Sequence, residues 1–124
     1  MATVRNILVV EDEESVRLAI VAGLDVLGGF SVMTAADGMT GLQMIKTNHP
    51  DVLLIDLLLP GLDGIEVLSA LRALGEATRP SRVVLMTAHA NPVPEGSIQD
   101  LGADALLAKP FRLADLARAI GDES

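Results

Sequence analysis

Short runs of consecutive apolar residues recur along the chain, separated by longer stretches in which apolar residues return at helical spacing. Four runs are too short for a helix and do not alternate with polar residues, which is typical of strands buried on both faces of a parallel sheet. These runs are Ile7–Val10, Val52–Ile55, Val83–Met86 and Ala105–Ala108. A fifth segment, Ser31–Ala35, mixes polar and apolar residues and is predicted to be an edge strand.

Helices are predicted between the strands, where apolar positions share one helical face. These positions are Val16, Ile20, Leu24 and Leu27; Leu42 and Ile45, in a helix ending near Asn48-His49-Pro50; Ile65, Leu68 and Leu71; and Leu113, Leu116, Ala117 and Ile120. Between Asn91 and Leu101, two prolines and a glycine oppose a helix, so only a short helix beginning near Pro94 is expected. The repeated strand–helix unit predicts one α/β domain over residues 1–124, with right-handed crossovers and helices on both sides of a parallel sheet.

Composition and charge restrict the classes of function. Half of the 124 residues are hydrophobic, which is ample for one core, and the absence of cysteine excludes disulfides, thiolate metal sites and a cysteine nucleophile. Nine basic and seventeen acidic residues give a net charge of −8, which disfavours direct binding to nucleic acid or to an anionic membrane. No apolar run approaches the roughly 20 residues of a membrane span, and no signal peptide is recognisable, so a cytoplasmic location is expected.

Polar residues follow directly after the four buried strands. Glu11 and Asp12 follow the first, Asp56 the second, Thr87 the third and Lys109 the fourth. Because the carboxyl ends of parallel strands lie along one edge of the sheet, these side chains should converge. Each has a simpler interpretation on its own: a helix cap for Asp12, a turn residue for Asp56, a loop hydroxyl or a surface lysine for the others. Their joint placement at four strand ends favours a common site.

The predicted site combines an excess of negative charge with the side chains needed for phosphoryl transfer. Two carboxylates ~4 Å apart repel by about 4 kcal/mol at an effective dielectric constant near 20, and Lys109 offsets only one charge. A bound cation is therefore expected, and oxygen ligands without His or Cys favour Mg²⁺. An aspartate can accept a phosphoryl group as an acyl phosphate. Glu13 and Glu14 are expected to complement the dipole of the first helix, and His89 is assigned no metal role.

The combined motifs resemble the receiver domain of two-component response regulators. The residues that carry this resemblance are Glu11-Asp12, Asp56-Leu57-Leu58-Leu59-Pro60-Gly61-Leu62-Asp63-Gly64, Thr87-Ala88 and Lys109-Pro110-Phe111. The resemblance covers essentially the whole chain and implies a flavodoxin-like doubly wound (βα)5 fold with a parallel five-stranded sheet of order 2-1-3-4-5. It also implies a phosphoacceptor signalling domain rather than an enzyme, one that assists its own Mg²⁺-dependent phosphorylation and dephosphorylation.

By this resemblance, Asp56 would be the phosphoacceptor and would receive its phosphoryl group from a histidine kinase or a histidine phosphotransfer protein. Asp12 and Asp56 would bind Mg²⁺ or Mn²⁺ through their carboxylates. Leu58 would bind the ion through its backbone carbonyl, and Glu11 would act partly through water.

The remaining motif residues would contact the phosphoryl group or shape the loops, again by resemblance. Thr87 would hydrogen-bond a phosphoryl oxygen, and Lys109 would form an ion pair with it. The Lys109–Pro110 peptide would be cis, which is uncommon even before proline. Gly64 would relieve the loop before the third helix, which Asp63 would cap.

Three features depart from the family pattern. Glu11 replaces the more common aspartate and is one methylene longer, and Leu106 stands where the family usually has a switch tyrosine or phenylalanine. The fourth helix contains two prolines. The phosphorylation site therefore looks intact and the output machinery altered. We expect phosphorylation to re-order the Ala88–Gly102 segment instead of moving an aromatic side chain.

Output is expected through contact with a downstream protein or output domain, and the resemblance is compatible with a phosphorylation-dependent dimer. One alternative is a pseudo-receiver that docks without being phosphorylated, against which the complete set of site residues argues. An acyl-phosphate hydrolase of the haloacid dehalogenase type would carry a second aspartate at the position of Leu58. A flavodoxin-like cofactor binder would need a phosphate-binding loop after the first strand, which this sequence lacks.

Overall fold

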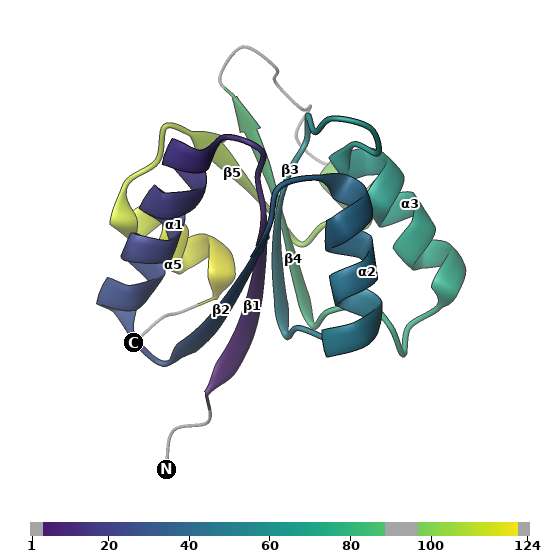
Figure 1. The fold of residues 1–124 in the computed structure, drawn as a ribbon, viewed down its shortest axis with the longest axis horizontal. Helices are drawn as coiled ribbons and strands as arrows, with labels where there is room; N and C mark the ends of the chain where they lie inside the picture. The colour runs from purple at the N-terminus through teal and green to yellow at the C-terminus, as the bar shows by residue number, and fades with distance from the viewer. Residues whose placement is uncertain (1–3, 89–96, 122–124) are drawn as a thin grey trace.

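Five parallel strands form one sheet in the order β2-β1-β3-β4-β5 (Figure 1). The structure is a computed structural model that describes residues 4–88 and 97–121. Its strands are β1 (Arg5–Val10), β2 (Phe30–Ala35), β3 (Val52–Asp56), β4 (Arg82–Ala88) and β5 (Ala105–Lys109). The predicted flavodoxin-like order is confirmed, and so is the prediction that the mixed segment Ser31–Ala35 forms an edge strand.

Helices cover both faces of the sheet, as Figure 1 shows. The helices α1 (Glu14–Leu27) and α5 (Leu113–Ile120) lie on one face, and α2 (Gly38–Asn48) and α3 (Gly64–Leu74) on the other. Of the fourth helix the structure describes one turn, α4 (Ser97–Asp100), and the predicted start near Pro94 lies outside the described residues. None of the helices in the described part of the chain has the length and apolar character needed to cross a bilayer.

The core consists of two apolar layers, one on each side of the sheet. Successive strand residues point to opposite faces, so Ile7 and Val9 pack toward α1 and α5, while Leu8 and Val10 pack toward α2 and α3. All four of these side chains are completely buried, as are those of Val52–Ile55 in the neighbouring strand β3. The uninterrupted apolar runs therefore occur because both faces of these strands are covered.

The strands extend beyond their apolar runs at both ends. Strand β1 begins at Arg5 and β4 at Arg82, because backbone pairing continues through residues whose polar side chains leave the sheet. At the other end, Asp56, Thr87 and Lys109 belong to their strands instead of following them. The sheet ladder therefore holds the backbone of three predicted site residues.

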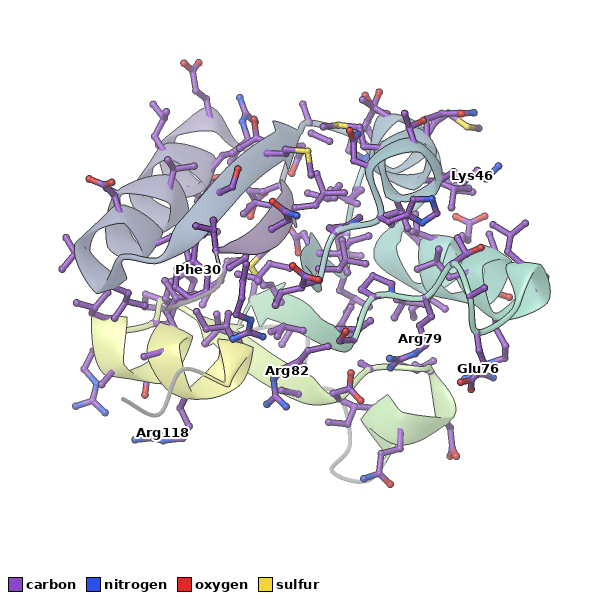
Figure 2. All side chains as sticks on the ribbon, turned by 90° about the horizontal axis from the view of Figure 1, so that it is seen from below. Phe30, Lys46, Glu76, Arg79, Arg82 and Arg118 are labelled. Carbon is purple, nitrogen blue, oxygen red and sulfur yellow. The ribbon has the colours of Figure 1, made fainter. Side chains whose placement is uncertain are left out.

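Arginines from the sheet hold the C-terminal end of α5. Arg82 donates from Nε to the backbone carbonyl of Ala119 at 2.6 Å, and Arg5 donates to that of Ile120 at 3.4 Å. Figure 2 views this end of the molecule and shows Arg82 beside α5. The last carbonyls of a helix lack partners within the helix and carry partial negative charge, so cationic donors satisfy and stabilise them. The end of α5 is thereby fixed to β1 and β4.

Candidate functional site

Three carboxylates and one ammonium group meet at the carboxyl ends of β1, β3 and β5. Carboxylate oxygens of Glu11, Asp12 and Asp56 lie within 4.8 Å of one another. Lys109 Nζ lies 2.7 Å from Glu11 Oε1 and 3.0 Å from Asp56 Oδ2. The structure therefore brings together four of the residues that the sequence places at strand ends.

Glu11 is completely buried, and both of its carboxylate oxygens are hydrogen-bonded. Oε1 accepts from Lys109 Nζ, and Oε2 accepts from the Glu13 backbone N–H at 3.1 Å. A buried carboxylate without such partners would carry a large desolvation penalty. The resemblance implied that Glu11 acts partly through water. In the structure the Glu11 carboxylate contacts Lys109 directly, and its side chain is one methylene longer than that of the aspartate usual in the family.

Lys109 is shared between two carboxylates. Burial by itself lowers the pKa of the Lys109 ammonium, but the hydrogen bonds and negative charges of Glu11 and Asp56 outweigh burial and hold the pKa above its ordinary value of 10.5. The lysine is therefore charged at neutral pH. It neutralises one of the three negative charges at the site, so the cluster retains an excess of negative charge.

Asp12 is exposed, unlike its neighbour Glu11. The interpretation of Asp12 as the cap of the first helix is wrong, because α1 has Glu13 at its N-cap position and no side-chain cap bond there. Within residues 4–88 and 97–121, no hydrogen bond or ion pair engages the Asp12 carboxylate. This carboxylate can therefore turn toward a ligand without breaking a contact.

Asp56 is the last residue of β3 and is nearly buried. Its Oδ1 is 3.4 Å from the Leu58 backbone nitrogen, a long hydrogen bond that leaves this oxygen weakly held. The backbone of the following loop approaches closely: the Gly64 N–H donates to the Leu57 carbonyl at 3.0 Å, and a Cβ at Gly64 would overlap the Asp56 carbonyl oxygen. The expectation that Gly64 relieves this loop therefore has a steric basis.

Helix α3 begins with the cap that the sequence predicts. The Asp63 carboxylate accepts from the Glu66 N–H at 2.9 Å, and the Glu66 side chain accepts from the Asp63 N–H at 3.1 Å. This reciprocal capping box fixes Asp63 as the N-cap and Gly64 as the first residue of the helix. The loop that carries Leu57–Gly61 is thus anchored at both ends.

Thr87 is buried near the end of β4, where its neighbour Ala88 pairs with Lys109 of β5. Its hydroxyl donates to the Ala88 backbone carbonyl at 3.2 Å. The register places Thr87 at the same end of the sheet as the acidic cluster. His89, which the sequence analysis set aside as a metal ligand, lies outside the described residues.

Two leucines near the site bear on earlier expectations: Leu58 lies two residues after the proposed acceptor Asp56, and Leu106 stands where the family usually has an aromatic residue. Leu58 is 57% exposed, so its side chain faces solvent beside Asp56 while its backbone stays near the carboxylate. Leu106 is half-buried and packs against the core layer under α2 and α3. The Lys109–Pro110 peptide is cis, as predicted.

One contact of the site was not predicted. Arg17 of α1 donates from Nη1 to the backbone carbonyl of Glu11 at 2.7 Å. In the sequence, an arginine next to Val16 is typical of the polar face of an amphipathic helix. No sequence signal reports a bond from such a side chain to a backbone carbonyl.

The donor atoms of the cluster suit a hard divalent cation. All are carboxylate oxygens from Glu11, Asp12 and Asp56, close enough together to face one ion. Oxygen ligands of this kind favour Mg²⁺ or Mn²⁺ over softer metals. A divalent cation would also balance the negative charge that Lys109 leaves uncompensated.

Comparisons with known proteins agree with this geometry. The family model for the response regulator receiver domain matches residues 7–121. The chain is 38% identical over 111 residues to the response regulator MprA of Mycobacterium avium (strain 104), covering 90% of this chain and 47% of that protein. The chain thus spans about half the length of the curated relatives it matches.

Solved structures of receiver domains share the fold. The receiver domain of the Francisella response regulator 1452 has a TM-score of 0.80 and 30% identity, covering 94% of this chain and 93% of that one. The receiver domain of the sensor histidine kinase PA1611 from Pseudomonas aeruginosa PAO1 has a TM-score of 0.77 and 33% identity, covering 94% and 98%. That structure contains a magnesium ion coordinated in its active site cleft.

Proposed function

Because this chain belongs to the family of response regulator receiver domains, we propose that it accepts a phosphoryl group on the carboxylate of Asp56. Receiver domains are signalling domains that interact with histidine kinases and with downstream output domains. The observation that carries the proposal is the ion pair of Lys109 with Asp56 at 3.0 Å, beside the carboxylates of Glu11 and Asp12. This ion pair places the ammonium group of Lys109 directly against the nearly buried carboxylate of Asp56, the proposed acceptor.

In the proposed transfer, an Asp56 oxygen attacks the phosphorus of a phosphohistidine on the donor protein. An O–P bond forms while the N–P bond breaks, and the bonding electron pair stays on the histidine nitrogen. The Lys109 ammonium, already 3.0 Å from Asp56 Oδ2, offsets negative charge on the transferred group. The Thr87 hydroxyl is proposed to donate to one of its oxygens.

A divalent cation fits this proposal. Asp12 and Asp56 would hold Mg²⁺ or Mn²⁺ through their carboxylates, together with the Leu58 carbonyl, and Glu11 would act partly through water. When bound, the ion offsets the charge of the acceptor and phosphoryl oxygens. Support comes from the oxygen cluster and from the magnesium ion in the related receiver domain of PA1611.

The phosphoryl donor is proposed to be a histidine kinase or a histidine phosphotransfer protein. Residues 1–124 are proposed to form one receiver domain that signals by protein contact, with a downstream protein, an output domain or a second copy of itself. The docking-module alternative predicts the same contacts without phosphorylation, so chemistry at Asp56 distinguishes the two.

The proposal is tested by incubating the protein with acetyl phosphate and Mg²⁺ and measuring its intact mass. The wild type should gain the mass of one phosphoryl group, and Asp56→Asn should gain none while unfolding at a similar urea concentration. Asp25→Asn, at an exposed position of α1, is the matched control and should be labelled like the wild type. Full labelling of Asp56→Asn would refute the assignment, and an unlabelled wild type would favour the docking module.

A further inference from the structure

We propose that Arg17 is a positioning residue that aims the two adjacent acidic side chains Glu11 and Asp12 at the metal site. This inference rests on the proposed function, because it concerns the cation that phosphorylation of Asp56 would need. In this proposal Arg17, a residue of α1, raises the affinity for a divalent metal ion although it does not contact the ion itself.

The contact that carries the inference is the hydrogen bond from Arg17 Nη1 to the Glu11 carbonyl. Its length of 2.7 Å is short for a nitrogen donor, as is common when the donor is charged. Arg17 is half-buried, and its own backbone N–H donates to the Glu13 carbonyl at 2.9 Å, the first bond of the helix. The guanidinium therefore reaches back from a fixed helix to the loop that precedes it.

The geometry of the peptide unit explains why this carbonyl matters. The Glu11 carbonyl lies in the same rigid plane as the N–H and Cα of Asp12. Holding the oxygen therefore sets the direction in which the Asp12 side chain leaves the backbone. On the other side of Glu11, its N–H donates to the Ala35 carbonyl at 3.0 Å. The two bonds fix the peptide units before and after Glu11.

Asp12 depends on this backbone bond more than Glu11 does. The Glu11 carboxylate is also held through its own oxygens, by Lys109 and by the Glu13 N–H. The Asp12 carboxylate has no hydrogen-bonding or ionic partner in the part of the chain that the structure describes. The backbone therefore sets the point and direction from which the Asp12 side chain reaches toward Asp56, and the Arg17 bond is the contact that fixes the adjoining peptide.

Positioning and simple electrostatics predict opposite signs for the loss of Arg17. A positive charge near the cluster opposes cation binding, so electrostatics alone predicts tighter binding when the charge is removed. Positioning predicts weaker binding, since the carboxylates no longer converge. Residues that orient metal ligands typically change metal affinity by about 10–100-fold when they are replaced. The direction of the change therefore distinguishes the two.

The test measures Mn²⁺ affinity by electron paramagnetic resonance, following the loss of the free-ion signal in the unphosphorylated protein. Arg17→Met should weaken binding by about tenfold, the lower end of the range for residues that orient ligands. Arg17→Lys should recover most of the affinity, because one ammonium donor can replace one Nη1 bond. The matched control is Arg72→Met, which removes an arginine bonded to the Asp100 carbonyl at 2.6 Å, far from the cluster, and should bind Mn²⁺ like the wild type.

The outcomes separate this inference from the proposed function. In an Asp12→Asn background, Arg17→Met should lose most of its effect, because the side chain it positions is no longer a carboxylate. Equal or tighter Mn²⁺ binding by Arg17→Met, with wild-type binding intact, would overturn the role of Arg17 alone. Urea unfolding of the same variants distinguishes a loss of stability from a loss of metal affinity: lower stability with unchanged Mn²⁺ affinity would also overturn it. A wild type that binds no Mn²⁺ would overturn the metal-dependent function and this inference together.

Discussion

Lys109 stabilises the folded domain by separating carboxylates that would otherwise repel, and Lys109→Met measures that contribution. Glu11 is completely buried and Asp56 nearly so, and a carboxylate oxygen of one lies within 4.8 Å of a carboxylate oxygen of the other. At an effective dielectric constant of about 20, two unit charges at this distance repel by about 3.5 kcal/mol. Removing the shared ammonium exposes this repulsion and leaves two buried charges without their partner. Such losses typically cost about 3–5 kcal/mol.

We expect Lys109→Met to lower the free energy of unfolding by about 3 kcal/mol at pH ~7 in EDTA, near the lower end of this range because solvent reaches Asp12 and part of Lys109. Urea unfolding followed by circular dichroism gives the value. The matched control is Lys46→Met, which replaces the other lysine of the chain at an exposed position of α2. It should change stability by less than about 0.5 kcal/mol.

Added Mg²⁺ should stabilise Lys109→Met more than the wild type. Without the ammonium, the ion no longer competes with Lys109 for Glu11 and Asp56, so the variant should bind it more tightly. A ligand at about 100 times its dissociation constant stabilises the folded state by about 2.7 kcal/mol, which is large enough to detect. The reasoning is refuted if Lys109→Met matches the wild type in EDTA, or if Mg²⁺ stabilises both proteins equally.

Three further predictions concern pH, the close backbone approach and the phosphoryl lifetime. The ion pairs hold the pKa of Lys109 above its unfolded value of 10.5, so their stabilisation is fully present below that pH and is lost as the pH rises through the higher folded-state pKa. The stability difference between wild type and Lys109→Met should therefore stay constant up to pH 10.5 and shrink above it in urea titrations. Gly64→Ala should cost about 3 kcal/mol of unfolding free energy in the same assay, because its Cβ would overlap the Asp56 carbonyl oxygen; a change below about 0.5 kcal/mol would contradict the close approach. Leu58→Asn should shorten the lifetime of the acyl phosphate, since the exposed leucine cannot orient a hydrolytic water and an amide can; intact mass after donor removal measures the decay, and a wild-type lifetime of seconds would speak against this prediction.

The parallel sheet and its two core layers could be predicted from the hydrophobic pattern because the central strands are buried on both faces, whereas the strand order was implied by the family resemblance. Ile7–Val10 and Val52–Ile55 must be apolar throughout, and this leaves an uninterrupted run that can be read directly. The ends of the strands are harder to predict. Backbone hydrogen bonds continue through Arg5 and Asp56 whatever their side chains, so hydrophobicity marks the buried middle of a strand and not its limits.

The meeting of the site residues could be predicted from topology, but their partners could not. Parallel strands bring Glu11, Asp56 and Lys109 to one edge of the sheet regardless of rotamers. The sharing of Lys109 between two carboxylates depends on side-chain lengths, above all on the extra methylene of Glu11. The contact of Arg17 with a backbone carbonyl depends on how α1 is placed against β1, and residue spacing along the helix carries no information about it.

The arginine contacts at the end of α5 determine how the domain bears mechanical load. Arg82 and Arg5 join the last carbonyls of α5 to β4 and β1, the two strands that flank β3 at the centre of the sheet. These bonds transmit a pull on the C-terminal end of α5 to β1 and β4, and they oppose the peeling of α5 from the surface turn by turn. Tension at this end therefore reaches β1, whose opposite end leads directly into Glu11 and Asp12 of the acidic cluster.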